Sequence, residues 1–193
     1  MNKLEYFWVD TCCIDKTNSV ELSEAINSMF RWYYNASRRY VYLIDVSSDG
    51  FRSDDVDGLF RNSRWFTHEW TPQELLAPDN LTFFSAEGVP LGDKASLAQD
   101  IAIITHIPVR VIRFVQNLTI YDVEQCMLWA IGRQVKREED SVYSLLGILK
   151  VRMPLIYGQG KANAFARLRK EVSNARADDP SSGIRSAFAR RWL

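Results

Sequence analysis

Cysteine and histidine are scarce in this 193-residue chain, which holds three Cys and two His. An odd number of cysteines does not make a disulfide framework, and so few ligands supply a structural zinc site poorly. We therefore expect no metal site, and we expect Cys12, Cys13 and Cys126 to be buried free thiols. A redox pair of the adjacent Cys12 and Cys13 is the alternative, although a disulfide between neighbouring residues is strained.

Net charge and long apolar runs are also missing. Lys and Arg total 24, as do Asp and Glu, so no overall field attracts nucleic acid or an anionic membrane surface. No apolar run approaches the roughly 20 residues that span a bilayer, and no basic-then-apolar signal opens the chain. These absences predict a cytoplasmic protein with no membrane span and no nucleic-acid partner.

The first half of the chain has the pattern of an α/β fold. Residues 6–14 and 40–46 are aromatic and β-branched without helical spacing, which predicts two buried strands. Residues 19–37 between them have apolar residues at helical spacing, so we expect a parallel strand–helix–strand unit. A third strand is expected at 81–85 and a turn at 87–92.

The second half is predicted to be mostly helical. Apolar residues at helical spacing predict helices at residues 95–104, 121–133, 138–149 and 161–175. We therefore expect one domain over residues 1–176, with an α/β half at 1–92 and a helical half at 93–176. Residues 177–193 are expected to form a tail or linker.

Residues 63–78 (SRWFTHEWTPQELLAP) have an unusual composition for a helix that only closes a core. We expect the helix to begin near residues 70–71 and to end before Pro78, because proline is tolerated in a first helical turn and not inside a helix. Glu74 follows Trp70 by one helical turn, so both side chains lie on one face. The alternative for Glu74 is a surface carboxylate paired with an arginine.

Polar residues stand near the ends of the two predicted strands. Asp10 and Asp15 flank the end of the first strand, and Ser47 follows the second. Ligands bind beyond the carboxyl ends of parallel strands, so we expect Asp15, Ser47, Trp70 and Glu74 to approach one edge of the sheet. They would form a small-molecule pocket with an aromatic shelf and a carboxylate. Loop and cap hydrogen bonds are the alternative role for Asp10 and Asp15.

A Gly-Gln-Gly sequence stands at residues 158–160. It could cradle a phosphate where a helix begins, or it could be the turn that leads into the last helix. Residues 137–140 (REED) are interpreted as a charged helix start, since acidic residues favour the positive end of the helix dipole.

Several blocks of this sequence resemble the HET (heterokaryon incompatibility) domain of filamentous fungi. Residues 6–16 (YFWVDTCCIDK) resemble its first signature block, and residues 63–78 resemble its second. The third is matched, in order, by residues 129–130, 137–140, 143–147, 153–160 and 164–165. The resemblance implies a role in nonself recognition after hyphal fusion, with growth arrest and cell death. Expected partners are further copies of the domain or other incompatibility proteins.

HET domains also resemble TIR domains, which have a flavodoxin-like α/β fold. Enzymatic TIR domains use a glutamate to cleave the nicotinamide–ribose bond of NAD, and Glu74 falls at the matching place. By this resemblance Glu74 would contact the ribose and stabilise an oxocarbenium-like transition state. Trp65 or Trp70 would stack on a ring, while Asp10 and Asp15 would shape the pocket. NAD is thus a candidate substrate, and no bound cofactor is implied.

The sequence departs from the family pattern in two places. His68, Glu69 and Pro72 stand where the family usually has Arg, Gly and Leu. The family's N-terminal strand is also missing, so we expect a TIR-like parallel sheet that lacks its first strand, in a truncated chain. Two functions stay open: a cell-death effector with NAD glycohydrolase activity, or a non-enzymatic self-associating module or inert truncated paralogue.

Overall fold

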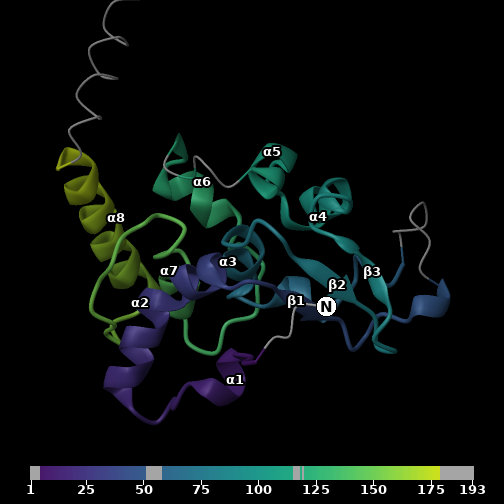
Figure 1. Ribbon diagram of the computed structural model, residues 1–193. Coiled ribbons are helices and arrows are strands. Elements are labelled where there is room, and N and C mark those ends of the chain that lie inside the picture. The colour runs from purple at the N-terminus through teal and green to yellow at the C-terminus, as the bar shows by residue number, and fades with distance from the viewer. Residues whose placement is uncertain (1–4, 51–57, 115–117, 119, 179–193) are drawn as a thin grey trace, which may run out of the picture.

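The computed structural model describes residues 5–50, 58–114, 118 and 120–178 (Figure 1). The α-helices in these ranges are α1 (Asp10–Cys13), α2 (Ser19–Asn35), α3 (Thr71–Leu76), α4 (Ala98–Thr105), α5 (Val109–Arg113), α6 (Val123–Leu128), α7 (Asp140–Tyr143) and α8 (Lys161–Ala177). Short 3-10 helices are η1 (Ser48–Gly50) and η2 (Arg64–Thr67), and the strands are β1 (Tyr40–Tyr42), β2 (Thr82–Phe84) and β3 (Pro90–Asp93). The protein is therefore a mixed α/β fold, as predicted.

The sheet is mixed and not purely parallel. Its strand order is β1-β2-β3, with β1 parallel to β2 and β2 antiparallel to β3. The parallel pair is joined by a crossover that contains η2 and α3, because parallel strands cannot be joined by a tight turn. The expected turn at 87–92 is partly a strand, since β2 and β3 form a hairpin closed by backbone bonds between Ser85 and both Gly88 and Val89. A wholly parallel sheet was the wrong expectation.

The predicted strand at residues 6–14 is wrong. Residues 10–13 form one helical turn, in which the amides of Cys12 and Cys13 donate to the carbonyl of Val9. Tyr6 and Phe7 are 88% and 86% exposed, and no strand of the described ranges pairs with them. An apolar run becomes a strand only where a neighbour satisfies its peptide groups, so the strand–helix–strand unit expected from residue 6 to 46 does not form.

The cysteines divide between surface and core. Cys12 and Cys13 are exposed, whereas Cys126 is buried. Burial is therefore confirmed for Cys126 and wrong for the adjacent pair, because the segment that carries the pair is not part of a sheet.

Helix α2 closes one side of the molecule; it begins at Ser19 as predicted and ends at Asn35, two residues before the predicted end. The Asn18 side chain caps it by accepting hydrogen bonds from the amides of Val20 and Glu21. Its buried residues are Ala25, Ile26 and Met29. The side chain of Asn27 is bonded in both directions to the backbone of Met153, at 3.2 Å each, which fixes α2 against the segment that follows α7.

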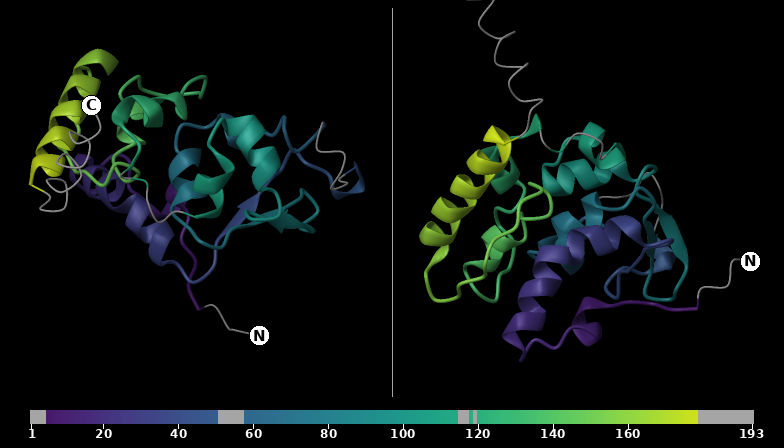
Figure 2. Two further views of the ribbon diagram at one scale, coloured as in Figure 1. Left: turned by 90° about the horizontal axis from the view of Figure 1, so that it is seen from above. Right: turned by 60° about the vertical axis from the view of Figure 1, so that its left-hand side comes forward.

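One main core runs through the molecule. The sheet lies at one end and α8 at the other (Figures 1 and 2), and the core cluster extends from Ile26 of α2 through Phe83 of β2 to Leu168 of α8. The Gln73 amide of α3 donates to the carbonyl of Ser144 over 2.7 Å inside this core. None of the helices in the described ranges has the length and apolar character needed to cross a bilayer. Most of the predicted tail, residues 179–193, lies outside the described residues.

Candidate functional site

Glu74 lies on α3 and is held by the segment just before that helix. The helix begins at Thr71 and contains Pro72 in its first turn, which confirms the predicted start. The indole Nε1 of Trp65 in η2 donates to Oε2 of Glu74 over 3.0 Å. Glu74 is partly buried, while its neighbours Gln73 and Leu75 are completely buried. The carboxyl group therefore lies in a partly enclosed part of the fold, bonded to η2.

Four other side chains act on this carboxyl group. We call the set the Glu74 cluster: Asp10, Tyr33, Trp65, Glu74 and Arg133. Tyr33 comes from α2 and Asp10 from α1, and Arg133 follows α6. Each of the four changes the pKa of Glu74, by charge or by hydrogen bonding. Segments far apart in the sequence thus meet at one carboxylate.

The surroundings of Glu74 in this cluster bring its pKa close to neutral pH. The pKa of Glu74 is raised to about 7, first by burial and second by the negative charge of Asp10. Hydrogen bonds from Trp65 and Tyr33 and the charge of Arg133 lower this pKa and so offset part of the effect. A carboxyl group that changes protonation near pH 7 suits acid–base or charge-stabilising chemistry.

Tyr33 and Arg133 have fixed protonation states in this cluster. Burial, followed by the charge of Glu74, raises the pKa of Tyr33 far above its ordinary value, so it stays a hydrogen-bond donor. Burial lowers the pKa of Arg133 to about 10, which leaves it cationic at neutral pH. The Arg133 guanidinium donates to the carbonyls of Trp129 at 2.8 Å, Phe66 at 2.5 Å and His68 at 3.3 Å. It is therefore held rigidly as the counter-charge of Glu74.

The structure brings some of the predicted site residues together. Asp10, Trp65 and Glu74 belong to the cluster. Trp70 is the N-cap residue of α3 and packs between the two hydrophobic clusters of the molecule. The Glu69 carboxylate is bonded to the Trp70 side chain, and burial raises the pKa of Glu69. Trp70 therefore supports the start of the helix that carries Glu74.

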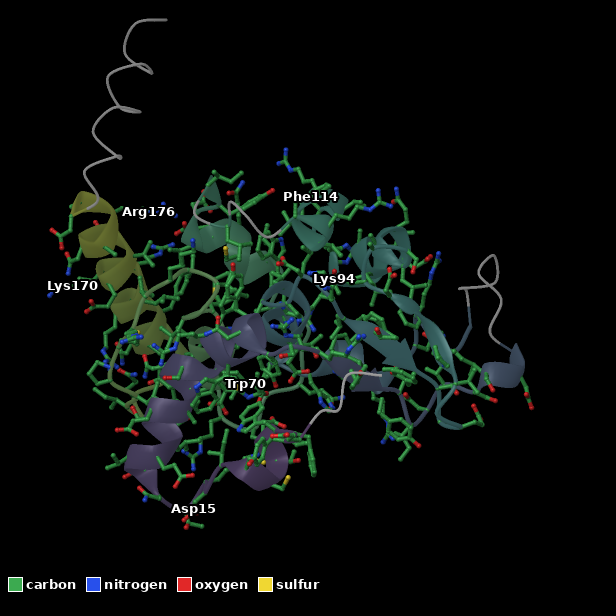
Figure 3. All side chains as sticks on the ribbon, in the orientation of Figure 1. Asp15, Trp70, Lys94, Phe114, Lys170 and Arg176 are labelled. Atoms are coloured by element: carbon green, nitrogen blue, oxygen red, sulfur yellow. The ribbon has the colours of Figure 1, made fainter. Side chains whose placement is uncertain are left out.

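Asp15 and Ser47 make their hydrogen bonds elsewhere. Oδ1 of Asp15 accepts from the amide and hydroxyl of Thr17, at 2.9 and 2.6 Å, and these bonds lower the pKa of Asp15. Ser47 accepts from the amide of Asp49 and helps to lower the pKa of Glu87. Figure 3 shows Asp15 at the margin of the molecule, away from Trp70. Loop and cap bonding, the alternative for Asp15, is what the structure shows.

Sequence reasoning missed Tyr33 and Arg133. Tyr33 stands in a segment whose apolar spacing is that of an ordinary amphipathic helix, so its hydroxyl gave no signal. Arg133 ends a segment whose sequence has the pattern of an ordinary helix. The neighbouring Gln134 pairs with the backbone of Thr67 and His68, and this pairing places Arg133 close to α3. No local pattern encodes that pairing.

The Gly-Gln-Gly sequence is the turn before α8. Gly160 is the N-cap residue of α8. The amides of Gly158 and Gly160 donate to Oε1 of Glu139, at 2.8 and 2.9 Å, and the amide of Lys161 donates to Glu138 at 3.1 Å. The backbone amides that would bind a phosphate therefore already donate hydrogen bonds to carboxylates of this chain. The acidic residues expected to start α7 also cap α8.

Comparison with known proteins decides the family. A family model described as "Heterokaryon incompatibility protein (HET)" matches residues 1–58. The chain is 49% identical over 174 residues to "Vegetative incompatibility protein HET-E-1" of Podospora anserina. The chain is a HET-domain protein.

The two matches cover different lengths of this HET domain. The family model ends before η2, whereas the alignment with the Podospora protein covers 87% of this chain. The chain spans 12% of the length of that relative. No solved structure matches the chain. The family assignment therefore comes from sequence, and the arrangement of the Glu74 cluster comes from the tertiary structure.

Proposed function

We propose that this HET domain is an effector of fungal heterokaryon incompatibility that acts in the cytoplasm and leads to cell death after nonself recognition. The HET family model supports the proposal, and so does the Podospora relative, whose name refers to vegetative incompatibility. The three signature blocks, which follow one another in the expected order, add to it.

The chemistry that we propose for the domain is cleavage of the nicotinamide–ribose bond of NAD, by analogy with TIR domains. The observation that carries it is the Glu74 carboxyl group, whose pKa is raised to about 7 and which Trp65 holds at 3.0 Å. A carboxylate beside the ribose stabilises positive charge that develops as the glycosidic bond breaks. Water then adds to the ribose, and nicotinamide, ADP-ribose and a proton are the products.

Each cluster member has a role in this proposal. Trp65 and Tyr33 donate to Glu74 and orient its carboxylate, and Asp10 and Arg133 set the charge around it. The positive nicotinamide ring of NAD would favour the ionised form of Glu74, as any nearby cation does. We assign no substrate contact to Asp15 or Ser47, whose hydrogen bonds lie outside the cluster.

The test measures nicotinamide release from NAD by the purified chain. The Glu74→Gln variant removes the charge and keeps the shape, and Glu24→Gln changes an exposed glutamate of α2 as the matched control. We expect nicotinamide release from the parent and from Glu24→Gln, and a loss of at least about 100-fold in Glu74→Gln, as is usual when an electrostatic stabiliser is removed. Equal release by both variants would exclude Glu74 as the catalytic group.

Cell death is measured separately from NAD cleavage. The parent and both variants are expressed in fungal cells, and growth arrest is scored. Arrest by the parent without nicotinamide release would exclude the NAD chemistry and leave the incompatibility function standing. Failure of the parent to arrest growth would count against the effector function itself.

A second candidate function is non-enzymatic self-association of the domain. The observation that favours it is exposed apolar surface near the first described residues and at β1, where Tyr40 and Tyr42 are 54% and 57% exposed and Ile44, just after the strand, is 66% exposed. In the described ranges β1 pairs only with β2, and an open strand edge is a template for association. Light scattering would show a concentration-dependent oligomer, and growth arrest by Glu74→Gln equal to the parent would favour this function over catalysis.

A further inference from the structure

Two adjacent thiols are exposed on the surface of α1. Cys12 and Cys13 are both exposed, and their Sγ atoms lie 3.9 Å apart. Neither belongs to the Glu74 cluster, and Cys126 lies buried in the main core. The proposed activity thus leaves this pair without a role.

The backbone of Val9 holds both sulfur atoms in place. The Val9 amide donates to Sγ of Cys13 over 3.4 Å, and the Cys12 thiol donates to the Val9 carbonyl over 3.7 Å. The pair is therefore arranged before any ligand arrives, which lowers the entropic cost of binding through both sulfurs.

The sulfur separation fits a bridging atom better than a disulfide. A disulfide bond is about 2.05 Å long, so direct oxidation would need the two sulfurs of α1 to approach and the helical turn to change. Two sulfurs bound to one tetrahedral zinc ion at about 2.3 Å lie about 3.8 Å apart. The observed 3.9 Å is close to that value. Trivalent arsenic forms bonds to sulfur of similar length with a narrower, pyramidal S–As–S angle. The two sulfurs therefore need to move only slightly closer to bind it, much less than a disulfide requires.

The ligand set favours an atom that needs only two sulfur ligands. Over the ranges 5–50, 58–114, 118 and 120–178, no group of three or more His, Cys, Asp and Glu side chains could hold a metal ion. The hydrogen bond between the two sulfurs raises the pKa of Cys12, so its thiol stays protonated at neutral pH. A ligand that carries its own proton acceptor is therefore better suited than a bare cation.

We propose that Cys12 and Cys13 form a vicinal dithiol site that captures trivalent arsenicals of the arsenoxide class. In this step both S–H bonds and the arsenic–oxygen bond break, and two arsenic–sulfur bonds form. The two thiol protons leave with the oxygen as water, and arsenic stays trivalent, so no oxidant or reductant is needed. The product is a ring that contains both sulfurs and the arsenic atom. The site is independent of the activity proposed for Glu74.

The experiment uses phenylarsine oxide with the full chain and reads the product by intact-protein mass spectrometry. We expect one phenylarsenic group per chain, which ethanedithiol removes and which excess glutathione does not, because a single thiol cannot compete with two linked ones. Cys12→Ser and Cys13→Ser change exposed side chains, and circular dichroism checks that both variants fold. Each should release the arsenical at a glutathione concentration at least ~10-fold lower than the parent.

Cys126→Ala is the matched control, because it removes the buried thiol and leaves the exposed pair. It should hold the arsenical as the parent does. Equal retention by the parent and by both serine variants in glutathione would overturn the proposal. So would a parent that gains no phenylarsenic group, including one that only loses the mass of two hydrogens by forming a disulfide.

Discussion

The indole Nε1 of Trp65 donates to Oε2 of Glu74 over 3.0 Å, and this bond joins η2 to α3. The ring of Trp65 also packs edge-on against Phe66 and Phe83, with centroids 5.0 and 5.6 Å away. The donor is thus fixed by the sheet and core, and the carboxylate that it holds belongs to the crossover between the two parallel strands. The same packing that completes the fold orients the side chain that we propose as catalytic.

The Trp65→Phe variant tests that bond directly. Phenylalanine keeps the ring packing and removes the N–H donor, so the ionised form of Glu74 loses a hydrogen bond. We expect the pKa of Glu74 to rise from about 7 by about one further unit, since a bond to a charged group contributes about 1.5 kcal/mol or more. NMR titration of the labelled carboxyl group measures this. Trp32→Phe, which changes an exposed ring of α2, should leave the titration where it is.

Removing the charge of Glu74 should stabilise the protein above neutral pH. The pKa of Glu74 is about 7 in the folded state, against 4.5 ordinarily, so between these values the folded state binds more protons than the unfolded state. The parent therefore loses stability as pH rises from 4.5 to 7. Glu74→Gln should avoid this loss and be more stable by about 2–3 kcal/mol at pH 8, with little difference at pH 4.

Urea unfolding of the parent and of Glu74→Gln across this pH range measures the effect. Glu24→Gln, at an exposed position, should follow the parent at every pH. A Glu74→Gln variant that is less stable than the parent at pH 8 would show that the carboxylate is favourably paired and not a source of strain.

Gly147 lies against Phe30 and should not tolerate a side chain. A Cβ atom there would stand 2.1 Å from Cβ and 2.7 Å from Cγ of Phe30, so α2 would have to move away from the segment after α7. We expect Gly147→Ala to destabilise the fold by about 3 kcal/mol, at the upper end of overpacking costs. Thermal unfolding measures the loss. Gly58→Ala is the control, because a Cβ atom at Gly58 meets nothing within 4 Å, and a similar loss there would contradict the steric explanation.

Lys94 is buried, and its ammonium group donates to the carbonyl of Pro78. Burial lowers the pKa of Lys94 to about 8, from 10.5 ordinarily. Between these values the unfolded state binds more protons, so the stability of the parent should rise as pH increases from 8 to 10.5. Lys94→Met should lack this rise and should be more stable than the parent at pH 7 by about 1 kcal/mol, after the cost of leaving the carbonyl unpaired.

Chemical denaturation at several pH values separates these two effects of Lys94. Lys170→Met, on the exposed side of α8, is the control and should keep the rise of the parent. A Lys94→Met variant with the same pH dependence as the parent would assign the rise to another group.

Local pattern was sufficient for several elements of the fold. Helices α2 and α8 begin where the sequence predicted, at Ser19 and Lys161, because each has a long apolar stripe that needs only a core to face. The start of α3 at Thr71 followed from Pro72. The sequence also singled out Glu74, through its place in the HET signature block.

Local sequence pattern did not predict which segments pair as strands. Residues 6–14 have the composition of a strand and form a turn of helix, because strand formation needs hydrogen-bond partners from elsewhere in the chain. The same limit hid β3, whose four residues become a strand only by pairing with β2.

The sequence by itself therefore determined the family, the amphipathic helices and the carboxylate at the centre of the site. Only the tertiary structure decided which side chains surround that carboxylate. It brought in Tyr33 and Arg133, kept Asp10 and Trp65, and placed the hydrogen bonds of Asp15 elsewhere. The physical reason is that helix periodicity and capping act between near neighbours in the chain, whereas the pKa of Glu74 depends on burial and on charges from α1, α2 and the segment after α6.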